Sequence, residues 1–263
     1  RAEEFTRWFA ENAGEDKRVT NYPLIRTPLP VLCLIALYVA LVFGLKKFMA
    51  NRPPFELKKA LIFHNLTLFC ISCFMVYEIS RQAYLSGFEL VCNSVDRTET
   101  GVGMTKILWL FFFSKLIEFL DTMFMVLRKN FRQVSFLHVY HHITIFLFWW
   151  AGIFAAPGGE AWASATLNSF VHCWMYGYYL LAALGFKDMW WKPYLTQLQI
   201  LQFFFNFGHA AYSLLFCDPS LDFPRWAGYG MLIYMSSLIV LFMNFYIRSY
   251  IAGKSKSPKK KTT

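Results

Sequence analysis

Charged residues are scarce in this sequence: only 16% of its 263 residues are Asp, Glu, Lys or Arg, whereas 57% are hydrophobic. Soluble globular domains carry about a quarter charged residues, so an ordinary soluble domain is excluded. Hydrophobic stretches of about twenty residues, enough for a helix to cross a bilayer, recur along the whole chain. The composition therefore predicts an all-α, polytopic membrane protein.

Negative charge is especially scarce, with 16 Asp and Glu against 26 Lys and Arg. A net charge of +10 can indicate a nucleic-acid partner, yet nearly all of the surplus lies between the hydrophobic stretches and in the C-terminal tail. Membrane topology explains that distribution better, and we expect no nucleic-acid partner.

Seven hydrophobic stretches are predicted to form seven transmembrane helices within a single domain over residues 1–263. They cover approximately residues 28–45, 60–82, 105–127, 134–156, 161–184, 193–217 and 226–248. A polar segment over residues 1–27 precedes them, and a basic tail over residues 249–263 follows. Because the chain begins at Arg1 rather than at methionine, we expect part of the native N-terminus to be missing.

The connections between the predicted spans alternate in charge. Basic connections follow the first, third and fifth spans, whereas the opposite loops carry only Arg97 and Arg225 as basic residues. The positive-inside rule then places the C-terminus in the cytosol and the N-terminus in the lumen. Lys260 and Lys261 resemble a dilysine signal for retrieval to the endoplasmic reticulum, with a merely solvated tail as the alternative.

Cysteine is also infrequent, with six residues. Cys92 and Cys217 lie at predicted lumenal edges, in an oxidising compartment, and we expect them to form a disulfide. The others lie within predicted spans, where we expect small buried apolar side chains: Cys33, Cys70, Cys73 and Cys173.

Histidines are concentrated in the segment Gln133–His142, which reads QVSFLHVYHH. On a helix, His138, His141 and His142 share an arc of roughly 100°. Polar rings in a membrane-length helix are costly unless they face something polar, and they indicate a functional site. The alternative is a structural role, in which the three histidines have their hydrogen bonds satisfied within the core of a helix bundle.

The third span carries Lys115, Glu118 and Asp121 at intervals of three residues, followed by Thr122. Each mid-helix charge costs about 2.5–3.5 kcal/mol on insertion scales. We therefore expect these side chains to pair with one another or to line a polar cavity. The alternative to a functional site is an ion-pair network with a structural role alone.

The fifth and sixth spans each carry a polar stripe at helical spacing. The fifth has Asn168, His172, Met175, Tyr176 and Tyr179, and the sixth has Thr196, Gln199 and Gln202. Glutamines between membrane helices can also be simple packing contacts worth about 0.6 kcal/mol each. Most of these polar residues lie towards the cytosolic ends, which predicts a polar chamber open to the cytosol above an apolar closed end.

Such a chamber suits an amphiphile with an anionic head and a long apolar tail. Basic residues at the cytosolic rim would hold phosphates of the head. The candidates include Arg128, Lys187 and Arg248.

Four strings together resemble the signature boxes of the ELO fatty acid elongases. They are KLIEFLDT from Lys115, QVSFLHVYHH from Gln133, NSFVHCWMYGYY from Asn168 and TQLQILQ from Thr196. They follow the family's order, and the resemblance covers essentially the whole chain. Cys173 stands where the family more commonly has an aliphatic residue.

This resemblance implies condensation of a long-chain acyl-CoA with malonyl-CoA at the endoplasmic reticulum membrane, giving a 3-ketoacyl-CoA two carbons longer, CO2 and CoA. No cofactor is implied. The implied fold has spans two to seven ringing a substrate tunnel, with span one outside. Implied partners are the 3-ketoacyl-CoA reductase, the dehydratase and the enoyl-CoA reductase of the elongation cycle. Whether the chain also forms a homodimer is left open. The strings look more like elongases of polyunsaturated chains than of saturated ones.

The chemistry of the residues is compatible with two routes. In the preferred ping-pong route, His141 attacks the thioester to give an acyl-imidazole, and His172 positions the carbonyls. Asn168 and Gln202 are candidate oxyanion donors. In the competing ternary route, His141 only deprotonates or stabilises the enolate. The ring-orienting candidates are His138, His142 and Asp121, and the substrate-binding candidates are Lys115, Glu118, Arg128, Asn168, Tyr176, Tyr179, Lys187, Gln199, Gln202 and Arg248.

Two other classes of membrane protein fit the sequence less well. Membrane di-iron desaturases and hydroxylases also contain HxxHH and use histidine as an iron ligand, but they need about eight histidines in three boxes. This chain has six, with His64 and His209 outside any box, so we expect no metal site. A retinal protein needs a lysine in its last span, and residues 226–247 contain none.

Overall fold

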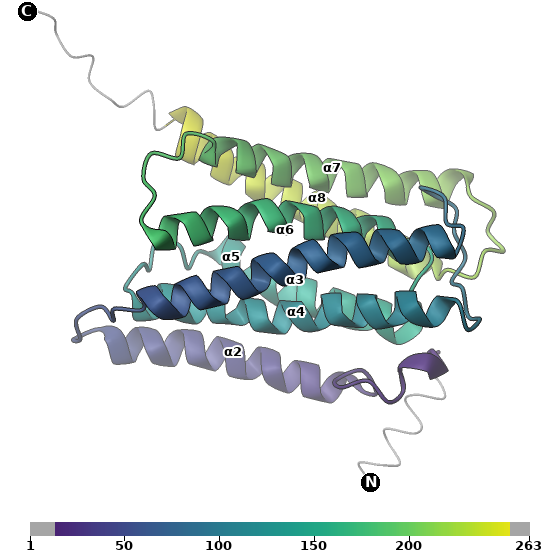
Figure 1. The fold of residues 1–263 in the computed structure, drawn as a ribbon, viewed down its shortest axis with the longest axis horizontal. Coiled ribbons are helices and arrows are strands. Elements are labelled where there is room, and N and C mark those ends of the chain that lie inside the picture. Colours follow the sequence, from purple (N-terminus) through teal and green to yellow (C-terminus); the bar gives the residue numbers. More distant parts are fainter. Residues whose placement is uncertain (1–13, 253–263) are drawn as a thin grey trace, which may run out of the picture.

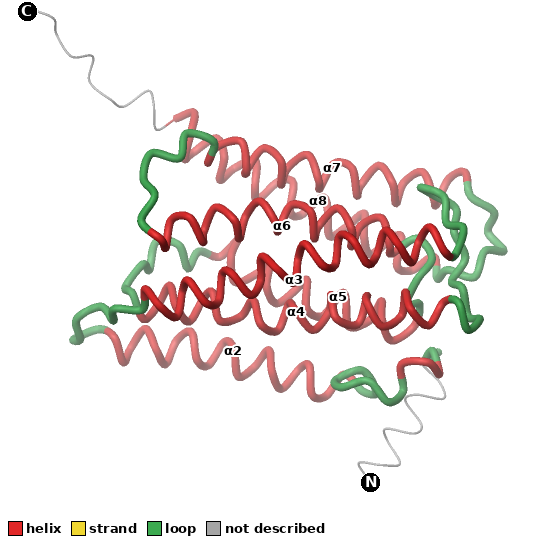
Figure 2. Tube along the Cα trace, viewed as in Figure 1, coloured by secondary structure: helices red, strands yellow, loops and turns green. Residues whose placement is uncertain are grey.

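The computed structural model describes residues 14–252, and its regular structure within that range is helical. The long helices run roughly parallel to one axis (Figures 1 and 2). They are α2 (Pro28–Met49), α3 (Lys58–Leu85), α4 (Gly101–Leu127), α5 (Phe136–Ala155), α6 (Ala161–Leu184), α7 (Lys192–Phe216) and α8 (Arg225–Tyr246). A short turn η1 (Lys17–Val19) precedes them, and a π-helical turn η2 (Ile247–Ile251) extends α8. All seven predicted segments are helices, with ends that differ by no more than four residues.

Four of the described helices are long and apolar enough to cross a membrane by length and composition: α2, α3, α5 and α8 with its extension. The other three have 24 to 27 residues. They carry most of the predicted site residues, including the charged Lys115, Glu118 and Asp121 on α4.

Local sequence explains where several helices begin and end. Ser135 caps α5, since its side chain accepts a hydrogen bond from the backbone N–H of His138. Pro28 stands at the start of α2, where a missing N–H costs nothing. Gly185 ends α6 in the left-handed region at φ 112°, a conformation that glycine adopts without strain. The α5 cap places the three histidines in the first two turns of that helix.

Contacts between helices close a ring in the order α3, α4, α5, α8, α7, α6 and back to α3. Helix α4 also touches α6 across the ring. Helix α2 packs outside the ring, against α4 and α5, and lies at the edge of the bundle in Figure 1. This arrangement places α4, α5, α6 and α8 around the polar residues described below.

The prediction that all four span cysteines are buried was wrong. Cys33, Cys70 and Cys73 are exposed on the outer surface of the bundle, and Cys173 is partly exposed. Their helices turn an apolar face outwards, as helices surrounded by lipid do, so an apolar residue within a span need not face the protein core.

The first and last described residues lie at opposite ends of the bundle (Figure 1). We call the end with the loops 86–100, 156–160 and 217–224 the disulfide end, because Cys92 and Cys217 are bonded there. The other end, with the connections 50–57, 128–135 and 185–191, is called the basic-loop end.

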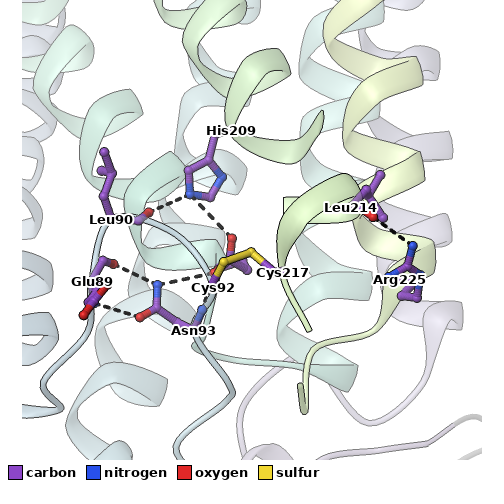
Figure 3. The surroundings of a disulfide bond; sticks show 9 residues. Glu89, Leu90, Cys92, Asn93, His209, Leu214, Cys217 and Arg225 are labelled. Carbon is purple, nitrogen blue, oxygen red and sulfur yellow. Dashed lines mark hydrogen bonds and ion pairs between the residues drawn. A yellow bond between two sulfur atoms is a disulfide. The ribbon is translucent and has the colours of Figure 1, made fainter. Parts of the chain in front are cut away.

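Beside the disulfide, polar contacts join the loops to the helices (Figure 3). The Glu160 carboxylate accepts a hydrogen bond from the Asn93 backbone N–H at 2.5 Å. His209 Nε2 lies 2.8 Å from the Leu90 carbonyl oxygen and 3.6 Å from Glu160 Oε2. These contacts connect the loop before α4 with α6 and α7.

An ion-pair network covers the same end. Arg97 bonds Asp16 at 2.6 Å and Asp222 at 2.5 Å, and Arg18 bonds Asp16 at 2.7 Å. Burial acts to raise the pKa of Asp16, but hydrogen bonds and charge from Arg18 and the charge of Arg97 leave that pKa below its usual value. The network joins the N-terminal segment to the loops before α4 and before α8.

Candidate active site

His138 is held by a threonine hydroxyl on α4, which is itself hydrogen-bonded to a tyrosine hydroxyl on α2. Its Nε2 lies 2.8 Å from Thr122 Oγ1 on α4, and that oxygen lies 2.8 Å from the Tyr38 hydroxyl on α2. Tyr38 is only 2% exposed, so the outermost helix contributes a buried side chain to this cluster. Because Nε2 of His138 is engaged by Thr122, it is not available to attack a substrate in this arrangement.

Asp121 connects three helices. Its Oδ1 lies 2.8 Å from His64 Nε2 on α3, and its Oδ2 accepts the Tyr176 hydroxyl hydrogen bond at 2.8 Å. The sequence hypothesis assigned Asp121 to orienting the reactive histidine. In the structure its hydrogen-bond partners are His64 and Tyr176, and the neighbouring Thr122 lies beside the histidine box instead.

Lys115, Glu118, Asn168 and His172 form one buried cluster between α4 and α6. Lys115 Nζ donates to Glu118 Oε1 at 2.8 Å and to Asn168 Oδ1 at 3.0 Å, and His172 Nδ1 lies 3.2 Å from Glu118 Oε1. Lys115 is 1% exposed and Glu118 is 2% exposed. Removing one partner of such a buried pair leaves an uncompensated charge, so these residues hold one another in place.

His141 is the histidine of the box that lines a cavity. The cavity is small, about 20 Å³, and its polar lining residues include His141, Asn168, Gln202 and Tyr234. His141 Nδ1 lies 3.3 Å from the Tyr234 hydroxyl on α8. His142 is 5% exposed, and its Nδ1 has no hydrogen-bond partner among residues 14–252.

A larger cavity of about 80 Å³ adjoins this one on the side of the disulfide end. The two share Phe148, Trp149, Ser164 and Met231 in their linings. The walls of the larger cavity are mostly apolar, and Glu160 and His209 are among the polar residues that line it. The two cavities thus lie next to each other between His141 and the disulfide end.

The remaining candidates lie away from the histidines. Gln199 Nε2 lies 3.6 Å from Met175 Sδ. Exposed candidates at or near the basic-loop end are Arg128, Tyr179, Lys187 and Arg248. Lys260 and Lys261 lie outside the described residues.

Sequence reasoning missed three residues that contact the candidate site: Tyr38, His64 and Tyr234. His64 carried a signal, because it is a polar ring within an apolar helix. The two tyrosines carried none, since single tyrosines are ordinary in apolar helices and lie outside the four strings.

A metal site is not favoured by the geometry. Within residues 14–252, no three His, Cys, Asp or Glu side chains are grouped as ligands of one ion. The di-iron alternative would need such groups, since histidine and carboxylate ligands surround each iron.

The fold and the site define a class: a helical membrane protein with clustered histidines, one of which lines a largely apolar cavity. The sequence profile described as the GNS1/SUR4 family, named ELO, matches residues 23–258. The human protein named "Very long chain fatty acid elongase 4" is 44% identical over 98% of this chain and 80% of its own length. "Very long chain fatty acid elongase 2" of Mus musculus is 39% identical over 94% and 83%. "Very long chain fatty acid elongase 5" of Xenopus tropicalis is 37% identical over 94% and 83%. The chain belongs to the ELO family.

Proposed function

We propose that this chain is a 3-ketoacyl-CoA synthase that condenses a long-chain acyl-CoA with malonyl-CoA. Membership of the ELO family supports the reaction, and His141 beside an apolar cavity is the observation that carries the assignment of the site. The proposed products are a 3-ketoacyl-CoA two carbons longer, CO2 and free CoA.

His141 is the proposed nucleophile. Of the three histidines in the box, His138 has its Nε2 bound to Thr122, and His142 is buried outside both cavity linings. His141 lines the cavity and binds Tyr234 through Nδ1, which leaves Nε2 for the thioester carbonyl. Attack forms the Nε2–carbonyl bond and breaks the carbon–sulfur bond, so CoA leaves as the thiolate.

Asn168 is the proposed oxyanion donor, and its amide orientation supports that role. Lys115 can only donate hydrogen bonds, so the Asn168 atom that it contacts must be the carbonyl oxygen. The amide NH2 group is then free to donate elsewhere, and Asn168 lines the same cavity as His141. Gln202 lines that cavity as well and is the second candidate donor.

The second half of the reaction uses the acyl group on His141. Malonyl-CoA loses CO2, and the electron pair of the broken carbon–carbon bond forms an enolate. The enolate carbon attacks the acyl carbonyl, and the imidazole leaves with the electrons of its bond to that carbon. His172, whose Nδ1 lies 3.2 Å from Glu118 Oε1, would polarise the carbonyls. In the competing ternary route His141 acts only on the enolate.

The acyl tail is proposed to occupy the space between His141 and the disulfide end. The cavities are smaller than a long acyl chain, so side chains such as Phe148 and Trp149 must move when it enters. Aromatic walls, which also include Phe203 and Tyr234, support the proposed preference for polyunsaturated tails, whose double bonds pack against rings.

The proposed topology has seven spans in the endoplasmic reticulum membrane, with the basic-loop end and the C-terminus in the cytosol. The exposed Arg128, Lys187 and Arg248 would bind the phosphates of CoA there. The disulfide at the other end supports a lumenal position, since that compartment is oxidising. The 3-ketoacyl product would pass to a reductase, a dehydratase and an enoyl-CoA reductase.

An elongation assay tests the function. Purified chain would receive labelled malonyl-CoA and a panel of saturated and polyunsaturated acyl-CoAs, and products would be identified by mass spectrometry. We expect a labelled 3-ketoacyl-CoA and a higher rate with polyunsaturated chains. Absence of product from every chain, with protein that is folded by gel filtration, would contradict the proposal.

A further inference from the structure

Tyr234 is a buried side chain that lies outside all four of the strings that resemble the family's signature boxes. It lies on α8, is 6% exposed, and places its hydroxyl 3.3 Å from His141 Nδ1. It also lines the cavity beside His141. A neutral imidazole carries one N–H, and the partner of one ring nitrogen decides whether the other can act as a nucleophile.

The direction of this hydrogen bond follows from the role proposed for His141. Nε2 can attack a thioester only if it carries a lone pair, so the single N–H of the neutral ring must be at Nδ1. The Tyr234 oxygen, 3.3 Å away, then accepts the hydrogen bond from His141 Nδ1–H.

We propose that Tyr234 is a positioning residue that accepts a hydrogen bond from His141 Nδ1–H and so keeps the ring proton on Nδ1. This inference rests on the proposed nucleophile, which needs the lone pair on Nε2. When Nε2 is acylated, the ring gains positive charge, and the hydrogen bond from Nδ1–H to the Tyr234 oxygen becomes charge-assisted and stronger. The contact therefore favours the acylated state more than the free enzyme.

Tyr140 provides a matched control. It lies next to His141 on α5, and its hydroxyl lies 2.8 Å from Ser237 Oγ on α8. Both tyrosine hydroxyls thus connect α5 with α8, but only that of Tyr234 contacts the histidine. Tyr234→Phe and Tyr140→Phe each remove one hydroxyl, and the second leaves the contact between Tyr234 and His141 intact.

The test is single-turnover release of CoA from an acyl-CoA without malonyl-CoA, measured across pH 5 to about pH 9, the range that brackets imidazole titration. We expect Tyr234→Phe to slow release about tenfold, the effect of one charge-assisted hydrogen bond. We also expect it to move the acidic limb of the pH profile, because the limb reports ionisation of His141. Tyr140→Phe should match wild type in rate and profile.

Thermal unfolding in detergent guards against misfolding of the Tyr234→Phe variant. That variant keeps the aromatic ring, so it should unfold at the same temperature as Tyr140→Phe, and slower release by Tyr234→Phe alone then reports the lost contact with His141. Equal rates and pH profiles for Tyr234→Phe and Tyr140→Phe would overturn the positioning role while leaving the nucleophile in place. Failure of the wild-type chain to release CoA would instead overturn the nucleophile proposal.

Discussion

The two ends of the bundle hold their polar residues in different ways. Towards the basic-loop end, polar contacts run from helix to helix, as between Thr122 and His138 or between Asp121 and Tyr176. At the disulfide end they run mainly from loop to loop, as between Arg97 and Asp222 or between Cys92 and Cys217.

This difference separates two requirements. A reacting group must be held to within a fraction of an ångström, and regular helices with locked partners do this better than loops. At the disulfide end, the loops need only remain in contact to cover the end of the bundle. A disulfide and ion pairs are sufficient for that. Variants of the first region should therefore alter activity, whereas variants of the second should alter stability.

The largest expected effect is that of His141→Ala on activity. Loss of the nucleophile should lower the rate of 3-ketoacyl-CoA formation by about 10³-fold or more, while His138→Ala should cost less because its ring only supports the site. Product formation by mass spectrometry and thermal unfolding in detergent would be measured on both. A His141→Ala rate within tenfold of wild type would contradict the assignment.

Glu118→Gln should sharpen the comparison, because this residue lies in the first region but should affect both activity and stability. It leaves Lys115 buried without its carboxylate partner, and removal of one member of a buried pair costs about 3–5 kcal/mol. We expect a lower free energy of unfolding from denaturant titration. The double variant Lys115→Met with Glu118→Gln should recover much of that stability but not the activity. Equal stabilities of the single and double variants would show that the charge of Lys115 is not the cause.

Cys92→Ala with Cys217→Ala should act on stability. Loss of a native disulfide closing a long loop costs about 2–5 kcal/mol. Unfolding of the double variant and of reduced wild type would be compared, and we expect the same lowering in both. Unchanged unfolding in both would mean that the ion pairs and the Asn93–Glu160 contact alone keep this end closed.

The smallest expected effect is that of Asp222→Asn. Its hydrogen bond from Arg97 lowers the pKa of Asp222, so its contribution is complete above the unfolded value of about 4 and is lost as pH falls through the lower folded value. Because the pair is largely exposed, we expect less than about 1 kcal/mol. Unfolding curves at pH 7 and pH 3 would show a difference from wild type at pH 7 that shrinks at pH 3. A difference that grows on acidification would contradict the sign.

The sequence predicted the helices well, because the length of each hydrophobic stretch marks a helix locally. The sequence also assigned four residues to one site, since helical spacing places each on a defined face of its helix: Lys115, Glu118, Asn168 and His172. It could not predict that Asp121 would bind His64, or that Tyr38 and Tyr234 would reach the histidines. Those contacts depend on which helices are neighbours and how each is rotated, and spacing within a single helix does not determine that.

The most direct test of the covalent route is the intact mass of the protein after incubation with an acyl-CoA alone. We expect a mass increase equal to one acyl group, mapped by peptide fragmentation to His141 and absent from His141→Ala. Formation of 3-ketoacyl-CoA by a wild-type protein that never carries an acyl group would contradict the covalent route and favour the ternary one.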